Sequence, residues 1–319
     1  MVVIHSPKNV LLVRMGGLGD LLVSFPSIYL LRRMLSPCFI TLICRQEYGI
    51  LLQQTGIVDD LISVDNRSIS PFFDTVQPPS QQFSAWLNKF DLIVGWFQSK
   101  QSFFRERLLA FKKRRDIGFI IAQKDIQEPL NHYFFRRTAE IIARKESLAT
   151  FSDCLFLPLS SKQKEEGLKL LGSNALEKKK LVIIHPGSGN RKKCWPLPNF
   201  LALIKRLGCR GVKGALITGI AEDWAQDELK SFCWPKDWLW LRNPSLIKLA
   251  GLLAQASFYV GNDSGITHLA AACRTKGLAL FRQDLEKLWQ PVGLINTLSA
   301  PCVSQIKKEE VWANIRNWL

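Results

Sequence analysis

The chain has 319 residues, of which 47% are hydrophobic and 22% charged, as in a globular protein with substantial hydrophobic cores. Its length suits two domains better than one. The excess of 43 Lys and Arg over 27 Asp and Glu gives a net charge of +16, which implies an anionic partner: nucleic acid, an anionic membrane surface or a phosphorylated substrate.

Cysteine and histidine usage argues against disulfide-stapled and metal-binding proteins. None of the eight cysteines pairs in a C-x-x-C motif, and the four histidines do not fall at metal-ligand spacing. We therefore expect reduced thiols in a cytoplasmic protein and no metal site. Residues 1–8 do not resemble a signal peptide, and no stretch reaches the roughly 20 apolar residues of a transmembrane helix, so we expect neither.

The first half of the chain alternates predicted strands and helices. A buried strand at residues 9–14 leads through a glycine-rich turn at 15–20 into a helix with apolar residues at helical spacing as far as Leu35. Further strands are expected at 39–44, 60–64, 91–96 and 117–121, and a helix at 128–146. An amphipathic segment at 103–115 ends in a basic run, Lys112, Lys113, Arg114 and Arg115.

The alternation stops at residues 148–160, where we place a domain junction, and then restarts. Strands are expected at 180–185, 214–219, 256–260 and 277–281. Helices are expected at 161–173, 198–207, 222–232, 245–255, after residue 265 and at 307–319. The sequence therefore predicts two Rossmann-like parallel α/β domains facing across a cleft, each with a turn that accepts a ligand.

A polar turn, Asn262-Asp263-Ser264-Gly265, follows the strand at 256–260 and opens a helix. The first turn of a helix has unpaired N–H groups and partial positive charge, so after a parallel strand it binds phosphate or carboxylate readily. Asp263 or Ser264 can equally be an ordinary N-cap that satisfies these donors. Taken alone, the turn favours capping.

The glycine-rich turn at 16–20 matches neither a dinucleotide fingerprint nor a P-loop. Its glycines permit close approach of another molecule to the backbone. Asp20 is either a first-turn acid stabilised by the helix dipole or a carboxylate base at the edge of a cleft.

A second loop, His185-Pro186-Gly187-Ser188-Gly189, continues through a basic stretch to Trp195-Pro196. Its N–H groups suit an anion, and Lys192 and Lys193 are cations that can reach a diphosphate. The alternative is a solvated basic loop.

In order and separation, these stretches resemble the lipopolysaccharide heptosyltransferase family, glycosyltransferase family 9. The resemblance spans nearly the whole chain and is weakest from about 65 to 125. Each motif alone is weak evidence for the family, whereas the three motifs together, in this order and at this spacing, are specific for it. The matching stretches are residues 10–20, 185–189 continuing to 193–196, and 262–271.

The resemblance implies a GT-B fold with an acceptor domain at 1–158, a nucleotide-sugar domain at 159–305 and a terminal helix at 306–319 that packs back on the first domain. It implies inverting, metal-independent transfer of heptose from ADP-heptose to the lipopolysaccharide inner core, without a cofactor. The protein would be cytoplasmic, with transient contact to the inner face of the inner membrane.

Roles of individual residues follow from the same resemblance. The proposed catalytic base falls on Asp20, and the lysine that contacts the diphosphate falls on Lys193. Residues expected to bind the donor are Ser188, Lys192, Glu222, Asp263, Ser264, Gly265 and His268. Residues expected near the acceptor are Gly17, His132 and Arg136.

The strand at 277–281 departs from the family pattern. It usually ends in Phe-Gly, and here it reads Phe281-Arg282. The glycine allows close approach around the nucleotide, so Arg282 alters the expected donor pocket. The Trp-x-Pro pattern that follows is still matched at Trp289-Gln290-Pro291.

Other functions remain open at this point. The same fold can use another nucleotide sugar or another acceptor, and a degenerate family member can be inactive, although Asp20 and Lys193 are both present. The net charge and the run at 112–115 also suit a nucleic-acid-binding protein, but no helix-turn-helix, zinc-finger or RNA-recognition motif accompanies them. We therefore expect no nucleic-acid partner.

Overall fold

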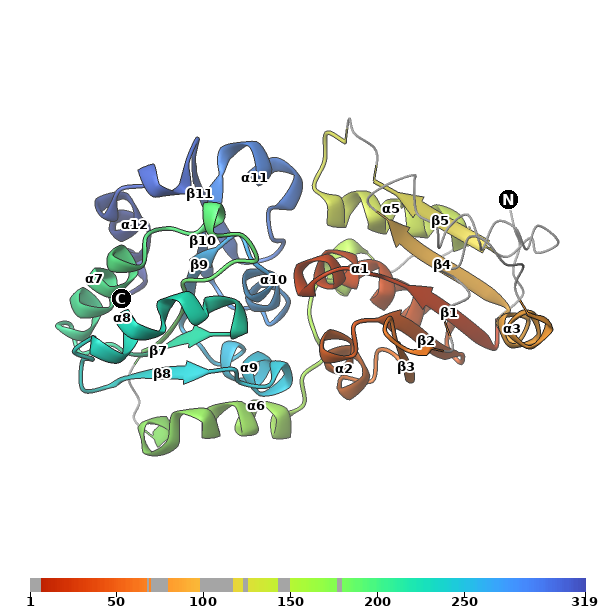
Figure 1. The fold of residues 1–319 in the computed structure, drawn as a ribbon, viewed down its shortest axis with the longest axis horizontal. Helices are drawn as coiled ribbons and strands as arrows, with labels where there is room; N and C mark the ends of the chain where they lie inside the picture. Colours follow the sequence, from red (N-terminus) through yellow and green to blue (C-terminus); the bar gives the residue numbers. More distant parts are fainter. Residues whose placement is uncertain are drawn as a thin grey trace. The chain divides into compact units, whose positions relative to one another are not determined.

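The computed structural model describes residues 7–67, 69, 80–97, 117–122, 126–142, 150–176 and 180–319. The chain divides into two units, Met1–Leu155 and Phe156–Leu319. In each unit a central sheet is surrounded by helices (Figure 1). The amphipathic segment at 103–115 with its basic run lies outside the described residues.

Unit 1 contains a five-stranded parallel sheet in the order β3-β2-β1-β4-β5. Its strands are β1 (Asn9–Val13), β2 (Phe39–Cys44), β3 (Asp60–Ser63), β4 (Leu92–Phe97) and β5 (Ile117–Ile121). Its described helices are α1 (Leu18–Leu35), α2 (Gln46–Gln54), α3 (Gln81–Leu87) and α5 (Leu130–Ile142), and a 3-10 turn covers Phe151–Cys154. The central strands β1 and β4 are almost wholly buried, which explains their uninterrupted apolar sequences.

Unit 2 contains a six-stranded parallel sheet in the order β11-β10-β9-β6-β7-β8. Its strands are β6 (Leu181–His185), β7 (Lys213–Thr218), β8 (Trp238–Arg242), β9 (Phe258–Asn262), β10 (Gly277–Arg282) and β11 (Ile295–Ala300). Its helices are α6 (Ser161–Leu168), α7 (Leu197–Gly208), α8 (Gln226–Ser231), α9 (Leu246–Leu253), α10 (Gly265–Ala272), α11 (Gln283–Trp289) and α12 (Lys308–Ile315). Its 3-10 turns are Lys169–Leu176, Arg191–Lys193, Ile220–Ala225, Val303–Gln305 and Arg316–Trp318.

The strand order of unit 2 places two loops next to each other. The chain builds outward from β6 to β8, returns to pair β9 with β6, and then builds outward on the other side. The loops that follow β6 and β9 therefore leave the same edge of the sheet at neighbouring positions. Such a reversal point at the carboxyl ends of parallel strands is where open α/β sheets bind ligands.

The terminal helix α12 was expected to return to the first domain. Its apolar residues Val311, Trp312 and Ile315 are buried in the core of unit 2, together with residues of α7. The guanidinium of Arg206 on α7 lies 3.9 Å from the ring centroid of Trp312. The apolar face of this helix is thus covered within unit 2 itself.

The predicted architecture of two parallel-sheet α/β domains is confirmed, while individual elements differ. The helix expected at 222–232 is a 3-10 turn followed by α8, because Glu222 has non-helical backbone angles (φ −101°, ψ 18°). Among the described α-helices and β-strands, those not expected from the sequence are α2, α3, β8, α11 and β11.

Candidate functional site

Asn262, the last residue of β9, holds the loop after β6 at both ends. Its Oδ1 accepts a hydrogen bond from the N–H of Trp195 at 2.9 Å, and its Nδ2 donates to the carbonyl of Pro186 at 2.7 Å. The side chain is fully buried. Asn262 was part of the sequence motif but was not among the expected site residues; a polar residue ending a buried strand was the available signal.

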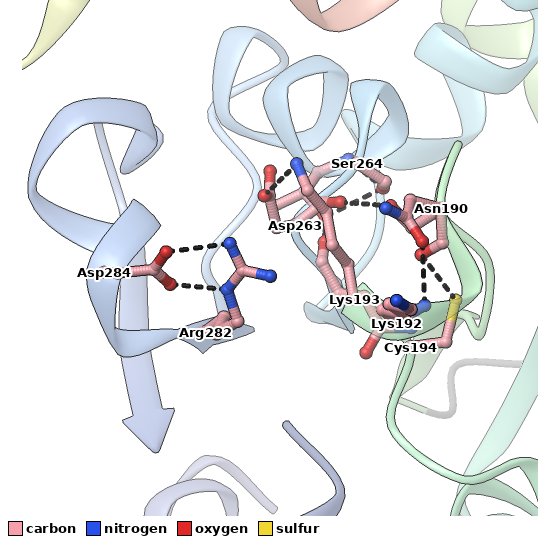
Figure 2. Close-up of polar contacts among 11 residues, drawn as sticks. Asn190, Lys192, Lys193, Cys194, Asp263, Ser264, Arg282 and Asp284 are labelled. Carbon is pink, nitrogen blue, oxygen red and sulfur yellow. Dashed lines mark hydrogen bonds and ion pairs between the residues drawn. The ribbon is translucent and has the colours of Figure 1, made fainter. Parts of the chain in front are cut away.

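Lys193 and Asp263 form an ion pair between the two loops. Nζ of Lys193 lies 2.7 Å from Oδ2 of Asp263, and the side chains are 27% and 7% exposed (Figure 2). The hydroxyl of Ser188 donates to the carbonyl of Asp263 at 2.7 Å, which fixes the turn from the other side. The structure thus brings together three residues expected at the donor site.

Ser264 caps α10, whose first residue is Gly265. Its Oγ accepts a hydrogen bond from the N–H of Thr267 at 3.3 Å. Of the two N-cap candidates considered from the sequence, Ser264 is therefore the N-cap of α10, whereas the carboxylate of Asp263 pairs with Lys193. The N-terminus of α10 contributes partial positive charge at the same place as Lys193.

Glu222 packs against the loop after β6. Its side chain is buried, and its Oε2 accepts a hydrogen bond from the N–H of Gly219 at 2.6 Å. A Cβ at Gly187 would lie 1.9 Å from Oε1 of Glu222, so this close approach requires glycine. Burial lowers the pKa of the neighbouring His185. The charge of Glu222 and the hydrogen bond between Nδ1 of His185 and the carbonyl of Ile217 act in the opposite direction and raise it, but burial has the larger effect.

The other two residues expected at the donor site differ in exposure. His268 is buried on α10. Lys192 is exposed in a 3-10 turn, where its N–H donates to Oδ1 of Asn190 at 3.0 Å. The side chain of Lys192 therefore extends from a short, capped turn of defined conformation.

Arg282 and Asp284 form a second ion pair next to the first (Figure 2). Nη2 of Arg282 donates to Oδ2 of Asp284 at 2.7 Å, and Nε donates to the other carboxylate oxygen. These hydrogen bonds raise the pKa of Arg282, and the charge of Asp263 adds to the effect. The residue that departs from the family pattern therefore lies beside the Lys193–Asp263 pair.

In unit 1, the glycine-rich turn is shorter than expected because α1 begins at Leu18 and includes Asp20 in its first turn. Oδ2 of Asp20 accepts a hydrogen bond from the N–H of Gly17 at 2.8 Å. Gly16 has a positive φ of 121°, and a Cβ there would lie 2.4 Å from the same oxygen. Glycine is thus required at position 16 to place this carboxylate.

The second oxygen of Asp20 faces Arg14, at 3.2 Å from Nη2. Arg14 is 3% exposed and also donates from Nε to the carbonyl of Asp20 at 2.8 Å and from Nη1 to the carbonyl of Trp96 at 3.2 Å. Burial lowers the pKa of Arg14 to about 10, and the charge of Asp20 opposes this. Arg14 therefore remains charged at neutral pH and holds Asp20 in place.

His132 and Arg136, both expected near the acceptor, lie on α5. Arg136 pairs with Glu128 at 2.6 Å and with Glu140 at 3.0 Å. The ring of His132 lies 3.9 Å from that of Phe151, and partial burial lowers its pKa. The charge of Arg136 is thus already balanced by two carboxylates, which weakens its suitability for binding an anion.

The two loops of unit 2 have the chemistry of a diphosphate site. They combine a half-buried ammonium group, a helix N-terminus and a glycine-containing loop whose backbone is fixed by Asn262. Within the described part of the chain, no group of three or more His, Cys, Asp or Glu side chains is arranged to hold a metal ion. None of the described helices is long and apolar enough to cross a membrane.

Comparisons with known proteins bear on the whole chain. The sequence profile described as "Glycosyltransferase family 9 (heptosyltransferase)" matches residues 110–312. Lipopolysaccharide heptosyltransferase 3 of Escherichia coli is 22% identical over 300 residues, which cover 86% of this chain and 83% of that protein.

Two solved structures share the fold. A family 9 glycosyl transferase of Veillonella parvula DSM 2008 superposes with a TM-score of 0.77 at 16% identity and covers 98% of this chain and 97% of its own. The E. coli ADP-heptose lps heptosyltransferase II superposes with a TM-score of 0.75 at 16% identity and covers 98% of both chains.

Proposed function

The chain belongs to glycosyltransferase family 9, and from this premise we propose that it transfers heptose from ADP-heptose to the inner core of lipopolysaccharide. Membership makes it a glycosyltransferase enzyme related to heptosyltransferases. The donor is inferred from the E. coli ADP-heptose lps heptosyltransferase II, which has the same fold. The observation that carries the proposal is the pairing of Lys193 with the turn at Asp263 and Ser264, at the reversal point of the unit 2 sheet.

This geometry suits the departure of a nucleoside diphosphate. When the bond between the anomeric carbon and the phosphate oxygen breaks, negative charge develops on the leaving ADP. The ammonium of Lys193 and the N–H groups at the start of α10 are preorganised to stabilise that charge. Asp263 must then share Lys193 with the diphosphate. We propose that these protein groups suffice without a metal ion or a cofactor.

Asp20 is the base in the proposed reaction. An acceptor hydroxyl attacks the anomeric carbon from the face opposite the diphosphate, which inverts the configuration, and its proton passes to the carboxylate of Asp20. The hydrogen bond from Gly17 and the contact with Arg14 set the position of this carboxylate. Of the other expected roles, those of Ser188, Lys192, Glu222 and His268 in donor binding remain part of this proposal.

The expected acceptor residues and location also remain proposals. Gly17, His132 and Arg136 would lie near the acceptor, and the enzyme would act in the cytoplasm at the inner face of the inner membrane. The net charge of +16 supports attraction to a phosphorylated lipid at an anionic surface.

The direct test is incubation with ADP-heptose and heptose-free inner-core lipopolysaccharide, followed by mass spectrometry. We expect the acceptor to gain the mass of one heptose residue as ADP is released, with full activity in excess EDTA. Lys193→Ala should abolish transfer, whereas Lys230→Ala, which removes an exposed ion pair with Asp227 on α8, should not.

Three results would contradict parts of this proposal. If the enzyme used another nucleotide sugar in preference to ADP-heptose, ADP-heptose would be rejected as the donor. If it transferred sugar only to an unrelated acceptor, the lipopolysaccharide inner core would be rejected as the acceptor. Loss of activity in EDTA that magnesium or manganese restores would reject metal-independence.

A further inference from the structure

A cavity of about 540 Å³ opens at the carboxyl end of β10 in unit 2. It is lined by Arg282, Gln283, Asp284 and Pro301. Its volume falls within the roughly 300–1,000 Å³ typical of small-molecule sites. None of these four residues belongs to the loops that form the proposed diphosphate site, so the cavity offers additional binding surface.

The charges that line the cavity are balanced. The guanidinium of Arg282 is held by both carboxylate oxygens of Asp284, with Nη2 to Oδ2 at 2.7 Å. Because the cation and the anion of this lining balance each other, the cavity does not select for an anionic ligand by charge alone. Donors of Arg282 and Gln283 beside acceptors of Asp284 and Gln283 instead match a group that both donates and accepts hydrogen bonds, such as a polyhydroxylated sugar.

The cavity is next to the proposed diphosphate site. The charge of Asp263 contributes, after the hydrogen bonds with Asp284, to the raised pKa of Arg282. Hydrogen bonds from Arg282 lower the pKa of Asp284, and the charge of Lys193 contributes to this lowering. Figure 2 shows the two ion pairs adjacent to each other at the ends of β9 and β10. A group attached to a diphosphate bound at Lys193 is therefore within reach of Arg282 and Asp284.

We propose that Arg282, Gln283 and Asp284 form the subsite that binds the sugar ring of the nucleotide sugar. The guanidinium and the amide donate hydrogen bonds to hydroxyl oxygens of the sugar, and the carboxylate accepts from its hydroxyl groups. Pro301 provides apolar surface for a C–H face of the ring. This inference rests on the proposed function, because the diphosphate at Lys193 is what delivers the sugar to the cavity.

Isothermal titration of ADP and of ADP-heptose, without acceptor, tests the subsite. The informative quantity is the ratio of the two dissociation constants, which reports what the sugar adds to binding. Arg282→Ala should lower the preference for ADP-heptose over ADP by about 10-fold, as expected for loss of a hydrogen bond to a charged group. ADP affinity itself should stay within about 2-fold. The matched control, Lys230→Ala, removes another exposed ion pair of unit 2 and should leave both affinities unchanged.

Asp284→Asn distinguishes a sugar subsite from a second phosphate site. The substitution releases the charge of Arg282 from its carboxylate partner. If Arg282 served the diphosphate, the variant would bind ADP and ADP-heptose more tightly to the same degree. The sugar subsite instead predicts a lower preference for ADP-heptose over ADP, because an acceptor of sugar hydroxyls has been weakened. Thermal unfolding of each variant checks that the fold is retained.

Alkylation of Cys302 provides a readout independent of calorimetry. Cys302 follows the cavity residue Pro301, and hydrogen bonds with Ser304 and the charge of Arg282 lower the pKa of its exposed thiol. Peptide mass spectrometry after iodoacetamide treatment should show slower alkylation of Cys302 with ADP-heptose than with ADP. In Arg282→Ala this difference should disappear.

The outcomes separate this inference from the proposed function. Failure of the wild-type protein to bind ADP or ADP-heptose would overturn the nucleotide-sugar site and the subsite with it. Normal binding of both ligands, with an unchanged preference in Arg282→Ala and Asp284→Asn, would overturn only the subsite. Equal weakening of both ligands in Arg282→Ala would assign Arg282 to the diphosphate and would also overturn the subsite.

Discussion

At the residue scale, the carboxylate of Asp20 is the first-turn acid considered from the sequence, and being one is compatible with the proposed role as base. It accepts a hydrogen bond from Gly17 as a first-turn acid, and it is the proposed base. The start of helix α1 therefore orients the carboxylate that we propose as the base. The sequence indicated the position of Asp20, but not its buried partner Arg14, because burial of a charge depends on residues that are distant in the chain, such as Trp96.

Asp20→Asn should lower the rate of transfer by about 10²- to 10⁴-fold, the usual range for loss of a general base. ADP affinity should be nearly unchanged, because the loops proposed to bind the nucleotide are in unit 2. Single-turnover assays and ADP titration measure the two effects.

The control for this substitution must also lose a partly buried ion pair. Asp59→Asn does so in unit 1, where Asp59 pairs with Arg32 and accepts a hydrogen bond from the N–H of Ile40. We expect Asp59→Asn to be destabilised but catalytically competent. A near wild-type turnover for Asp20→Asn would reject its role as base.

His185 should make stability depend on pH. Burial lowers its pKa in the folded protein, so below the usual pKa of about 6.5 the unfolded chain binds a proton that the folded protein does not. The free energy of unfolding should therefore fall as the pH drops from about 7.5 to about 5.5, and rise again in the opposite direction.

Urea unfolding of the wild type and of His185→Gln at both pH values measures this contribution. The free energy of unfolding of His185→Gln should fall less between the two pH values than that of the wild type, because the titrating imidazole is absent. The partly buried His132, whose pKa is also lowered, contributes equally to both proteins. Identical pH dependence in the two proteins would show that His185 is not held neutral by burial.

At the scale of elements, the central strands were predictable, as were the edge strands β3 and β5 of unit 1, whereas the edge strands of unit 2 were not. Strands β6 and β9 are fully buried and read as continuous apolar runs. The edge strands β8 and β11 are partly exposed and carry polar residues, so neither the apolar run nor a clean alternation marks them. The missed helices α2, α3 and α11 have only seven to nine residues, too few for a clear helical period.

Asn262 joins two elements, and its removal should affect both stability and ligand binding. Asn262→Ala leaves the buried N–H of Trp195 and the carbonyl of Pro186 without their side-chain partner. We expect a loss of about 2–4 kcal/mol in the free energy of unfolding, from two unsatisfied buried groups. ADP affinity should also fall, because the loop that carries Lys193 is no longer held at both ends.

Asn262→Asp is the matched variant. It keeps an acceptor for the N–H of Trp195 but replaces the donor to Pro186 with a carboxylate oxygen. We expect urea unfolding to show a lower free energy of unfolding for this variant, and titration to show a lower affinity for ADP. Wild-type ADP affinity in Asn262→Ala would show that the loop keeps its position without this residue.

At the scale of the whole molecule, three short motifs in register predicted the family, and the family profile bears out that prediction. The order of motifs along the chain reflects the order of the strands that place them, which is why spacing carried information that single motifs did not. The ion pair of Arg282 with Asp284 was not predictable in the same way. It depends on the local geometry at the end of β10, where this sequence departs from the pattern it otherwise resembles.

The net charge of +16 belongs to the whole molecule, and we predict that part of it captures the acceptor. Neutralising the run Lys112, Lys113, Arg114 and Arg115, which lies outside the described residues, should raise the KM for phosphorylated core lipid. Attraction between exposed charges is screened over about 8 Å at physiological salt, so raising the salt concentration should reproduce part of this change in the wild type. The KM for the donor should change less, because Lys193, the proposed partner of the diphosphate, lies in a half-buried site where it would act at contact distance.

A second quadruple variant separates local capture from net charge. Neutralising Lys162, Lys164, Lys169 and Lys248 removes an equal number of positive charges, four, from the surface of unit 2 instead. If capture depends on the run at 112–115, only the first variant should raise the acceptor KM strongly at low salt, and its remaining salt dependence should be smaller than that of the wild type. Equal effects of the two variants would assign capture to the overall field of the protein. An unchanged acceptor KM in the first variant at low salt would mean that the run at 112–115 does not contribute to binding of the acceptor and only makes its segment of the chain hydrophilic.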